Sequence, residues 1–244
     1  MIIECFPGDA MPLLGRYQED GLSEEERGLL DVANGAVAFI YFTGQLYRFD
    51  EFRTSRPSGH PPVPSFVQVL ELLERIRRES SSVEEKEILL AVMDALAFIE
   101  VSGQKRGLEE YPRYWETDTL PPVIAAFKTD SEAETWLDEQ LVPPYGARVL
   151  IGNQYHSVKR SRERREPGFL PIPTLEEFIG SHLEEGLPPA VAAFDTQADA
   201  ESWLANTPPS TRHAFITIGG KPHLAVCQEN VNHRALYPLM QAEQ

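Results

Sequence analysis

Two histidines and a cysteine are the side chains of this sequence best placed to share a reactive site. His156 and His223 each follow a glycine-containing pair typical of a tight turn, and His223 lies four residues before Cys227. Residues four apart on a strand lie on the same face. An imidazole can act as a general base or metal ligand, and a thiolate as a nucleophile. One hypothesis is therefore an enzyme that uses His156, His223 or Cys227.

The same three residues also fit a structural role. A zinc site needs about four ligands around the ion, and Cys227 needs a base whose proximity the sequence does not establish. The two cysteines, Cys5 and Cys227, form no Cys-x-x-Cys pair, and the sequence contains no glycine-rich phosphate loop, Gly-x-Ser-x-Gly or His-Glu-x-x-His motif. Hairpin histidines and a buried thiol are favoured, so we predict no catalytic residue, cofactor or bound metal.

A second candidate site is an aromatic segment in which Tyr111, Arg113, Tyr114 and Trp115 lie within five residues. Tyr, Trp and Arg dominate the energetics of protein interfaces, so these four residues are candidate partner-binding residues. The segment also joins the two halves of the chain, and linkers between small domains often pack against them. Docking within the chain is favoured, and partner binding stays open.

The sequence is strongly acidic, with 38 Asp and Glu residues against 22 Lys and Arg and a formal net charge of −16. Residues 1–118 account for −10 (12 basic, 22 acidic) and the remainder for −6 (10 basic, 16 acidic). Such a field repels phosphate backbones and attracts basic proteins, although acidity also serves solubility alone. We therefore expect a basic protein partner and no nucleic acid partner.

One basic run, KRSRERR from Lys159 to Arg165, interrupts this pattern. Such a run can bind a phosphate or a nucleic acid. No aromatic residues alternate with its basic ones, as they do in single-strand binding surfaces, and the net charge of the chain opposes polyanions. A solvated loop is therefore favoured.

The N-terminal sequence and the apolar stretches predict a cytoplasmic protein with no membrane contact. Residues 1–14 lack a basic leader followed by a sustained apolar stretch. The longest unbroken apolar stretch in a helical segment, residues 36–42, is far shorter than the roughly 20 residues of a membrane-spanning helix.

An internal duplication sets the elements that position the histidines. Leu120 to Leu137 (LPPVIAAFKTDSEAETWL) returns 67 residues later as Leu187 to Leu204 (LPPAVAAFDTQADAESWL), with 11 of 18 positions identical. Each copy contains a short apolar run, a helix with Trp136 or Trp203 on its apolar face, and two further runs around a turn pair. These patterns predict two superposable βαββ repeats in which the tryptophans are buried.

Residues 1 to about 115 are predicted to be mainly helical. Ser23 and Glu26 form a capping box that begins one helix, Ser65 is placed to cap a second, and a third runs from Ser82 to near Gly103. Prolines and glycines in residues 48–64 predict a loop. Residues 1–6 are predicted to form a short strand.

Together these patterns predict an α+β fold, in which a mainly helical N-terminal part precedes two tandem βαββ repeats that form a mixed or antiparallel sheet covered by helices. The expected boundaries are 1–117 for the helical domain, 118–186 for the first repeat and a connecting helix at 174–185, and 187–244 for the second repeat.

In general character the chain resembles the immunity proteins of bacterial polymorphic-toxin systems. The resemblance rests on acidity, size and the repeated units, in which Ala-Ala-Phe is followed by a helix ending in Glu-x-Trp-Leu. It implies a cytoplasmic, non-catalytic protein that neutralises a basic toxin by direct binding, as in a toxin–antitoxin pair. The alternatives are a regulatory or scaffold module and the enzyme described above.

Overall fold

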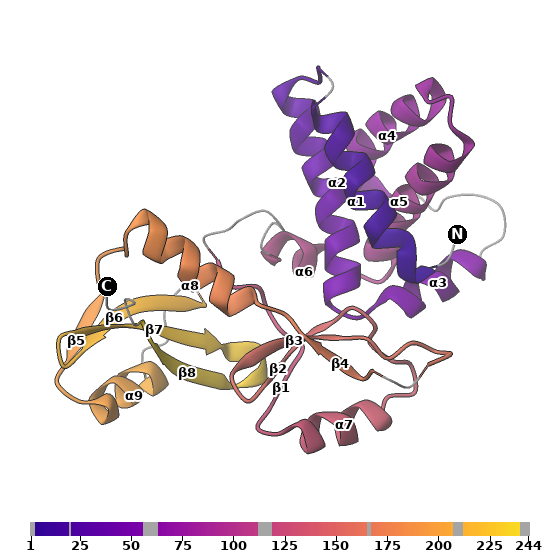
Figure 1. Cartoon of the computed structure of the whole chain (residues 1–244). Coiled ribbons are helices and arrows are strands. Elements are labelled where there is room, and N and C mark those ends of the chain that lie inside the picture. Colours follow the sequence, from indigo (N-terminus) through magenta and orange to yellow (C-terminus); the bar gives the residue numbers. More distant parts are fainter. Residues whose placement is uncertain are drawn as a thin grey trace. The chain divides into compact units, whose positions relative to one another are not determined.

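The computed structural model describes residues 3–19, 21–55, 63–111, 119–164, 167–206 and 212–239 (Figure 1). The chain divides into two compact units. The helical unit comprises Met1–Tyr114, Val142–Ala147 and Arg160–Arg165, and the repeat unit comprises Trp115–Leu141, Arg148–Lys159 and Glu166–Gln244. The α+β fold with a helical N-terminal part is confirmed. Two short segments from within the first repeat belong to the helical unit.

The helical unit is built around two long helices, α2 (Glu24–Phe42) and α5 (Val83–Val101), which pack against each other. Both contact α1 (Phe6–Glu19) and α4 (Val67–Glu79). The shorter elements are η1 (Ile3–Cys5), α3 (Leu46–Thr54), η2 (Pro64–Phe66) and α6 (Lys105–Glu110). Leu30, Leu73, Leu89 and Leu96 are among the fully buried side chains of the shared core. In the part of the chain that the structure describes, no single helix has the length and apolar composition to cross a membrane. Helices α2 and α3 have this length and composition only when taken together, and they are bent by 111° where they join.

The predicted helix signals of this unit are largely confirmed. The Ser23 hydroxyl accepts a hydrogen bond from the Glu26 amide (3.2 Å), and the Glu26 carboxylate accepts one from the Ser23 amide (2.9 Å), which completes the capping box. Ser82 caps α5. The helix ends just before Gly103, whose φ of +68° is the left-handed conformation that favours glycine.

The strand predicted at residues 1–6 is wrong for residues 3–6, which begin a helical segment instead; residues 1 and 2 lie outside the described residues. η1 leads directly into α1, in which Phe6 and Leu14 are fully buried. Pro12 lies inside α1, where it removes a backbone hydrogen bond and strains the helix. Burial of the apolar face therefore outweighs the proline, which sequence propensity alone does not reveal.

The loop predicted at residues 48–64 is wrong for residues 48–54, and residues 56–62 lie outside the described residues. The cap predicted at Ser65 is also wrong. Most of α3 lies in that range, because Tyr47 and Phe49 are buried in the core of the helical unit. Ser65 lies in η2, one residue before the N-cap of α4, and its hydroxyl donates to Glu100 (3.2 Å).

The segment Val142–Ala147 packs against the loop that joins α2 and α3. Gly146 has a φ of +84°, and atoms of the Tyr41 ring lie where a Cβ atom would be. Gly44 has a φ of +72°, and a Cβ atom added there would overlap Pro144. Tyr145 lies 6.3 Å, centroid to centroid, from each of the Tyr41 and Tyr47 rings. Glycine is needed at positions 44 and 146 both for the backbone angle and for the close approach.

The repeat unit holds two four-stranded mixed sheets, one from each repeat. In the first, β1 (Ala125–Phe127) is parallel to β2 (Arg148–Ile151), and β3 (Gln154–Val158) and β4 (Phe169–Pro171) continue antiparallel, with α7 (Asp130–Asp138) after β1. The second repeats this order with β5 (Ala192–Phe194), α9 (Gln197–Asn206), β6 (His213–Ile218), β7 (Lys221–Gln228), η3 (Glu229–Val231) and β8 (His233–Pro238). Helix α8 (Thr174–Glu185) joins the two repeats. Each repeat thus has one edge strand more than the predicted βαββ pattern.

The register of the two repeats is equivalent, as the duplication predicts. Both hairpins turn through two residues of positive φ, Gly152-Asn153 and Gly219-Gly220, which is the type I′ geometry that suits a two-residue hairpin. The edge strands β4 and β8 each end in a proline, Pro171 and Pro238, and edges tolerate the missing amide.

The tryptophans occupy equivalent positions but are half-buried rather than buried. The Trp136 ring lies 5.2 Å from Phe127, and the Trp203 ring lies 5.5 Å from Phe194. The fully buried side chains of these helices are smaller: Ala133 and Leu137 in α7, and Ala200 and Leu204 in α9. In the second repeat, α9 covers the outer face of the sheet through contacts with Ile216 and Cys227.

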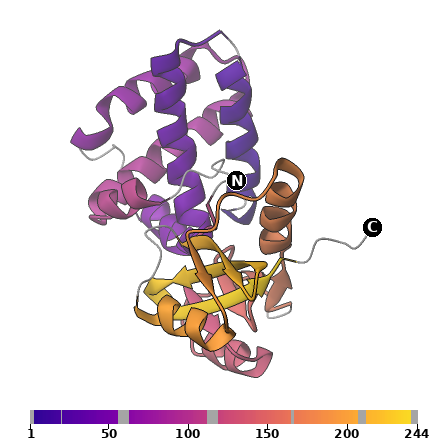
Figure 2. The same ribbon diagram turned by 90° about the vertical axis from the view of Figure 1, so that its left-hand side faces the viewer.

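The inner faces of the two sheets share one apolar core with α8. Its buried members come from the first repeat (Leu120, Val123, Leu150, Tyr155), from α8 (Leu175, Phe178) and from the second repeat (Phe215, Leu224, Val226, Leu239). α8 lies along one side of the repeat unit, and α7 and α9 lie along the other (Figures 1 and 2). The two repeats therefore cover each other's inner faces.

A buried polar cluster joins the repeats inside this core. Gln228 is fully buried, and its amide nitrogen donates to the Tyr155 hydroxyl (3.0 Å) and to the Pro121 carbonyl (2.9 Å). The Tyr155 hydroxyl in turn donates to the same carbonyl (3.1 Å). Burial raises the pKa of Tyr155 to about 12, so the phenol stays neutral at physiological pH.

Replacing Gly146 by Ala should destabilise the helical unit by about 2–4 kcal/mol, because the new methyl group overlaps the Tyr41 ring and the backbone must also hold a positive φ. Gly103→Ala is the matched control, because Gly103 has a similar φ but nothing near its Cβ position. The control should lose only about 1–2 kcal/mol. Denaturant unfolding measures both, and equal losses would contradict the packing account.

Tyr155→Phe should lower the free energy of unfolding by about 1–3 kcal/mol, because it removes a hydroxyl from a buried hydrogen-bond cluster. Tyr237→Phe is the control, since the half-buried Tyr237 also donates its hydroxyl to a backbone carbonyl of the other repeat, that of Asn153, but through a bond that is exposed to solvent. Its loss should be smaller, and a larger loss for the control would argue against the buried cluster as the main polar link between the repeats.

Candidate functional site

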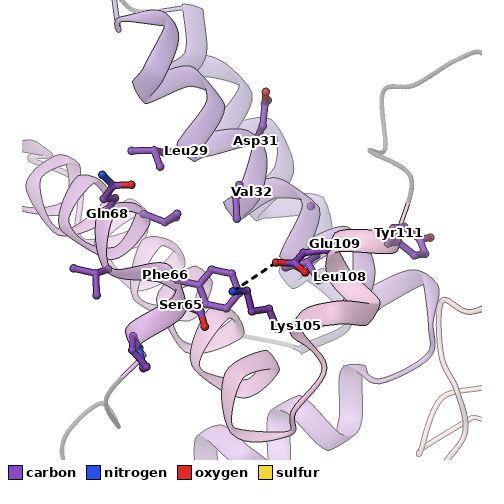
Figure 3. Close-up of a pocket in the computed structure, with 14 residues that line it drawn as sticks. Leu29, Asp31, Val32, Ser65, Phe66, Gln68, Lys105, Leu108, Glu109 and Tyr111 are labelled. Carbon is purple, nitrogen blue, oxygen red and sulfur yellow. Dashed lines mark ion pairs between the residues drawn. The ribbon is translucent and has the colours of Figure 1, made fainter.

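A hollow lies in the helical unit, between α2, the start of α4 and α6 (Figure 3). It is called the α2–α4–α6 groove below. Its volume is about 600 Å³, within the range of ligand-binding pockets. Its lining comes from all three helices and from η2: Leu29, Asp31, Val32, Gly35, Pro64, Ser65, Phe66, Val67, Gln68, Val69, Lys105, Leu108, Glu109 and Tyr111.

The floor of the groove is apolar and partly open to solvent. Phe66 is buried, whereas Val32 is 37% exposed and Val67 is 49% exposed. Val32 points from α2 toward the Phe66 ring (Figure 3). Leu29 and Leu108 are partly buried and pack on the core behind the groove. A partner that covered Val32 and Val67 would therefore remove apolar surface from water, which is favourable.

Polar side chains form the rim. Lys105 and Glu109 form an ion pair across one turn of α6 (3.6 Å), and both are exposed. Asp31 accepts a hydrogen bond from the Gln18 amide (2.6 Å). The exposed Lys105–Glu109 pair contributes little to stability, so these two groups can exchange partners at small cost.

Gly35 keeps part of the groove empty. It lies within α2, where a glycine costs about 1 kcal/mol relative to alanine. An added Cβ would meet only one atom within 4 Å, the Leu108 Cδ1 atom at 3.9 Å, and the φ of Gly35 is not in the positive range that favours glycine. Neither the backbone nor close packing requires glycine here, so its local effect is to leave space beside α6.

Tyr111 is the one residue of the predicted aromatic site that the structure describes. Its ring meets Phe39 edge-on, 5.5 Å between centroids, and it also lines the groove. Tyr111 thus packs within the helical unit and lines its groove, and its role in partner binding or in docking the two halves stays a prediction. Arg113, Tyr114 and Trp115 lie outside the described residues.

The two candidate histidines occupy equivalent positions in different sheets. His156 pairs with Val149 and Pro171, and His223 pairs with Ile216 and Pro238. Each Nδ1 atom lies 3.0 Å from a carbonyl oxygen two residues earlier, which fixes the proton on Nδ1 in the neutral ring. Their strand neighbours Tyr155 and Leu224 belong to the inner core, so the histidines lie on the outer faces of the two sheets. The duplication does not bring them together.

Cys227 is buried, and this burial raises the pKa of its thiol. The thiol therefore holds its proton, the opposite of what a nucleophilic cysteine needs. His223 lies on the same face of β7, but four residues along a strand is about 13 Å, too far for the imidazole to take the thiol proton. The geometry does not assemble His223 and Cys227 into a catalytic pair.

The basic run at 159–165 is partly engaged within the helical unit. The Arg162 guanidinium lies over the Tyr47 ring (4.5 Å to the centroid) and pairs with Glu51. The Arg162 amide also donates to the Tyr47 hydroxyl (3.0 Å), which itself donates to Glu4 (2.7 Å). Arg162 thus anchors this segment rather than extending into solvent as the predicted loop would.

Within the described ranges, no three His, Cys, Asp or Glu side chains are arranged to hold a metal ion. Comparisons of the chain with protein-family models, with curated proteins and with solved structures find no match.

Sequence reasoning missed the groove because its lining comes from segments about 30 to 80 residues apart. Val32 lies outside the apolar stripe of α2, and Val67 begins α4 directly after η2. The available signals were Gly35 inside a helical pattern and two valines at exposed helix positions, none of which indicates a groove by itself.

His233 should make stability depend on pH. Burial lowers its pKa below 6.5, and neither its Nε2 atom nor the Oε1 atom of its cross-strand neighbour Gln228 has a hydrogen-bond partner among the described residues. Because the unfolded chain then binds the proton more readily, this contribution to stability is present above about pH 6.5 and is lost as pH falls through the lower folded pKa.

Urea unfolding at about pH 7 and about pH 5.5 measures this effect. Wild type should lose more stability over this interval than His233→Gln, which has no titrating group at this position. An identical loss in the two proteins would exclude His233 as a source of the pH dependence.

Proposed function

We propose that this protein is a non-catalytic binder that captures a basic protein partner by direct contact. The observation that carries the proposal is the charge of the helices in the repeat unit. Together α7, α8 and α9 contain ten Asp and Glu residues and no Lys or Arg. All ten are exposed except the half-buried Glu134. These helices present only negative charge, which accelerates encounter with a positive surface.

The helical unit is acidic for a different reason. Several of its arginines are held in ion pairs with its own carboxylates, including Arg16 with Glu85 and Arg53 with Asp94. Arg75 and the Ser23 cap hold the pKa of Glu26 at about 2. The helical unit contains 21 Asp and Glu residues against 16 Lys and Arg, so carboxylates remain in excess and make its field negative.

The partner that fits this arrangement best is a basic toxin domain in the cytoplasm, which the protein would neutralise as an immunity protein does. Direct binding that covers a toxin's working surface requires no reactive site, and the separated His156, His223 and Cys227 agree with such a mechanism. A nucleic acid does not fit, because the field repels phosphates and Arg162 is engaged with Tyr47 and Glu51.

The first test is to coexpress the chain with the products of neighbouring genes and to purify any complex. The expected result is a complex with one basic protein, whose association rate falls by about tenfold or more between low and high salt while its dissociation rate changes less. A triple variant, E176Q/E184Q/E185Q in α8, should slow association several-fold. The control S131A/S202A, on α7 and α9, should not.

Two results would reject the proposal. One is association that is independent of salt and of the α8 variant. The other is that H156A/H223A/C227A stays folded but loses a biological activity in a host where no partner copurifies, which would favour an enzyme. If the basic partner is not toxic and is not inhibited on binding, the protein is a regulatory or scaffold module and not an immunity protein.

A further inference from the structure

We propose that the α2–α4–α6 groove binds an amphipathic helix of the partner, with apolar anchors in the groove and Lys or Arg residues flanking them. This inference rests on the proposed function, which supplies the premise that the partner is a basic protein. It adds which surface of this chain receives the partner and which kind of element the partner inserts.

The groove offers the apolar contact that the acidic surface lacks. Charge alone raises the encounter rate, but affinity is carried by a few apolar anchors in pockets. In the helical unit, the described large apolar side chains that are exposed are Val32, Val67, Val83 and Val101. Two of these four, Val32 and Val67, line the same groove as the buried Phe66 ring.

The dimensions of the groove suit a helix. Leu29, Val32 and Gly35 line it at intervals of three residues along α2, which spans about 9 Å. Successive turns of a helix are about 5.4 Å apart, so two anchors one turn apart fit within this length. The empty space beside Gly35 and Leu108 can receive one anchor, and the exposed Val32 and Val67 can cover another.

The charges at the rim select a basic helix over an acidic one. The charged residues of the lining are Asp31, Glu109 and Lys105, and Lys105 is already paired with Glu109. A partner Lys or Arg can approach Asp31 or take the place of Lys105 beside Glu109. An acidic helix would meet two carboxylates and the net charge of −16.

The test measures binding of three fluorescein-labelled peptides of about 14 residues to the full-length protein by anisotropy at ~0.15 M salt. The first peptide contains only Leu and Lys at amphipathic helical spacing. The second has Glu in place of each Lys, and the third has Ser in place of each Leu. The Leu/Lys peptide should bind, and the other two should bind at least about tenfold more weakly.

Two glycines of α2 provide matched variants. Gly35→Leu fills the groove, whereas Gly28→Leu makes the same change two turns earlier, outside the lining and in open space. Gly35→Leu should weaken binding of the Leu/Lys peptide at least about tenfold, and Gly28→Leu should leave its affinity unchanged. Neither should lower the melting temperature, because leucine is a better helix former than glycine. Should Gly35→Leu unfold the protein, V32S/V67S replaces it, since both valines are exposed.

The proposal is overturned if the Leu/Lys peptide fails to bind the wild type, binds both glycine variants equally, or is matched by the Glu peptide. Two other occupants give distinct results that also overturn it. Binding of the apolar dye ANS that Gly35→Leu alone abolishes, without peptide binding, would indicate a small-molecule site. Self-association in sedimentation that Gly35→Leu abolishes would indicate a second copy of the chain.

The partner purified for the proposed function separates the two ideas. If that partner binds Gly35→Leu as tightly as wild type, the groove inference fails and the proposed function stands. If no basic protein binds the wild type, the proposed function fails, and the peptide series still decides whether the groove takes a basic helix.

Discussion

Each sheet of the repeat unit is apolar on both faces, and the single helix within a repeat can cover only one of them. The second sheet shows the constraint plainly: Ile216 and Cys227 pack under α9, while Phe215, Leu224 and Val226 point the other way. A lone repeat would leave the second set in water. Duplication resolves this, because each inner face covers the other and α8 closes the shared core. The buried Gln228 amide then has to find its acceptors within this core, in Tyr155 and Pro121.

This arrangement has a consequence for function. Since the apolar surface of α7, α8 and α9 is used for packing, their outward faces are free to be entirely acidic. The duplicated histidines, His156 and His223, lie on the outer faces of separate sheets. Each donates a hydrogen bond from Nδ1 to a backbone carbonyl of its own hairpin. In the helical unit, by contrast, α2, α4 and α6 leave an apolar groove next to exposed charges. Charge for encounter and apolar area for affinity are the two components that a binding protein needs.

Much of the repeat architecture follows from the sequence, because a repeated pattern constrains both copies at once. The hairpin pairs Gly152-Asn153 and Gly219-Gly220 indicate their turn type directly, and the Ser23 capping box locates the start of α2. The edge strands were missed because β4 is only three residues long and both end in proline. α1 and α3 were missed because burial of Phe6, Tyr47 and Phe49 overrides local propensity. The groove depends on tertiary contacts between α2, η2 and α6, which no local pattern encodes.

The most direct test of the account is hydrogen–deuterium exchange on the full-length protein, alone and saturated with its purified basic partner. The account predicts slower exchange on binding in the segments that line the groove, around Leu29–Gly35, Pro64–Val69 and Lys105–Tyr111, with exchange in β3 and β7 unchanged. Protection confined to β3 and β7, around His156 and His223, would contradict it and return attention to those residues.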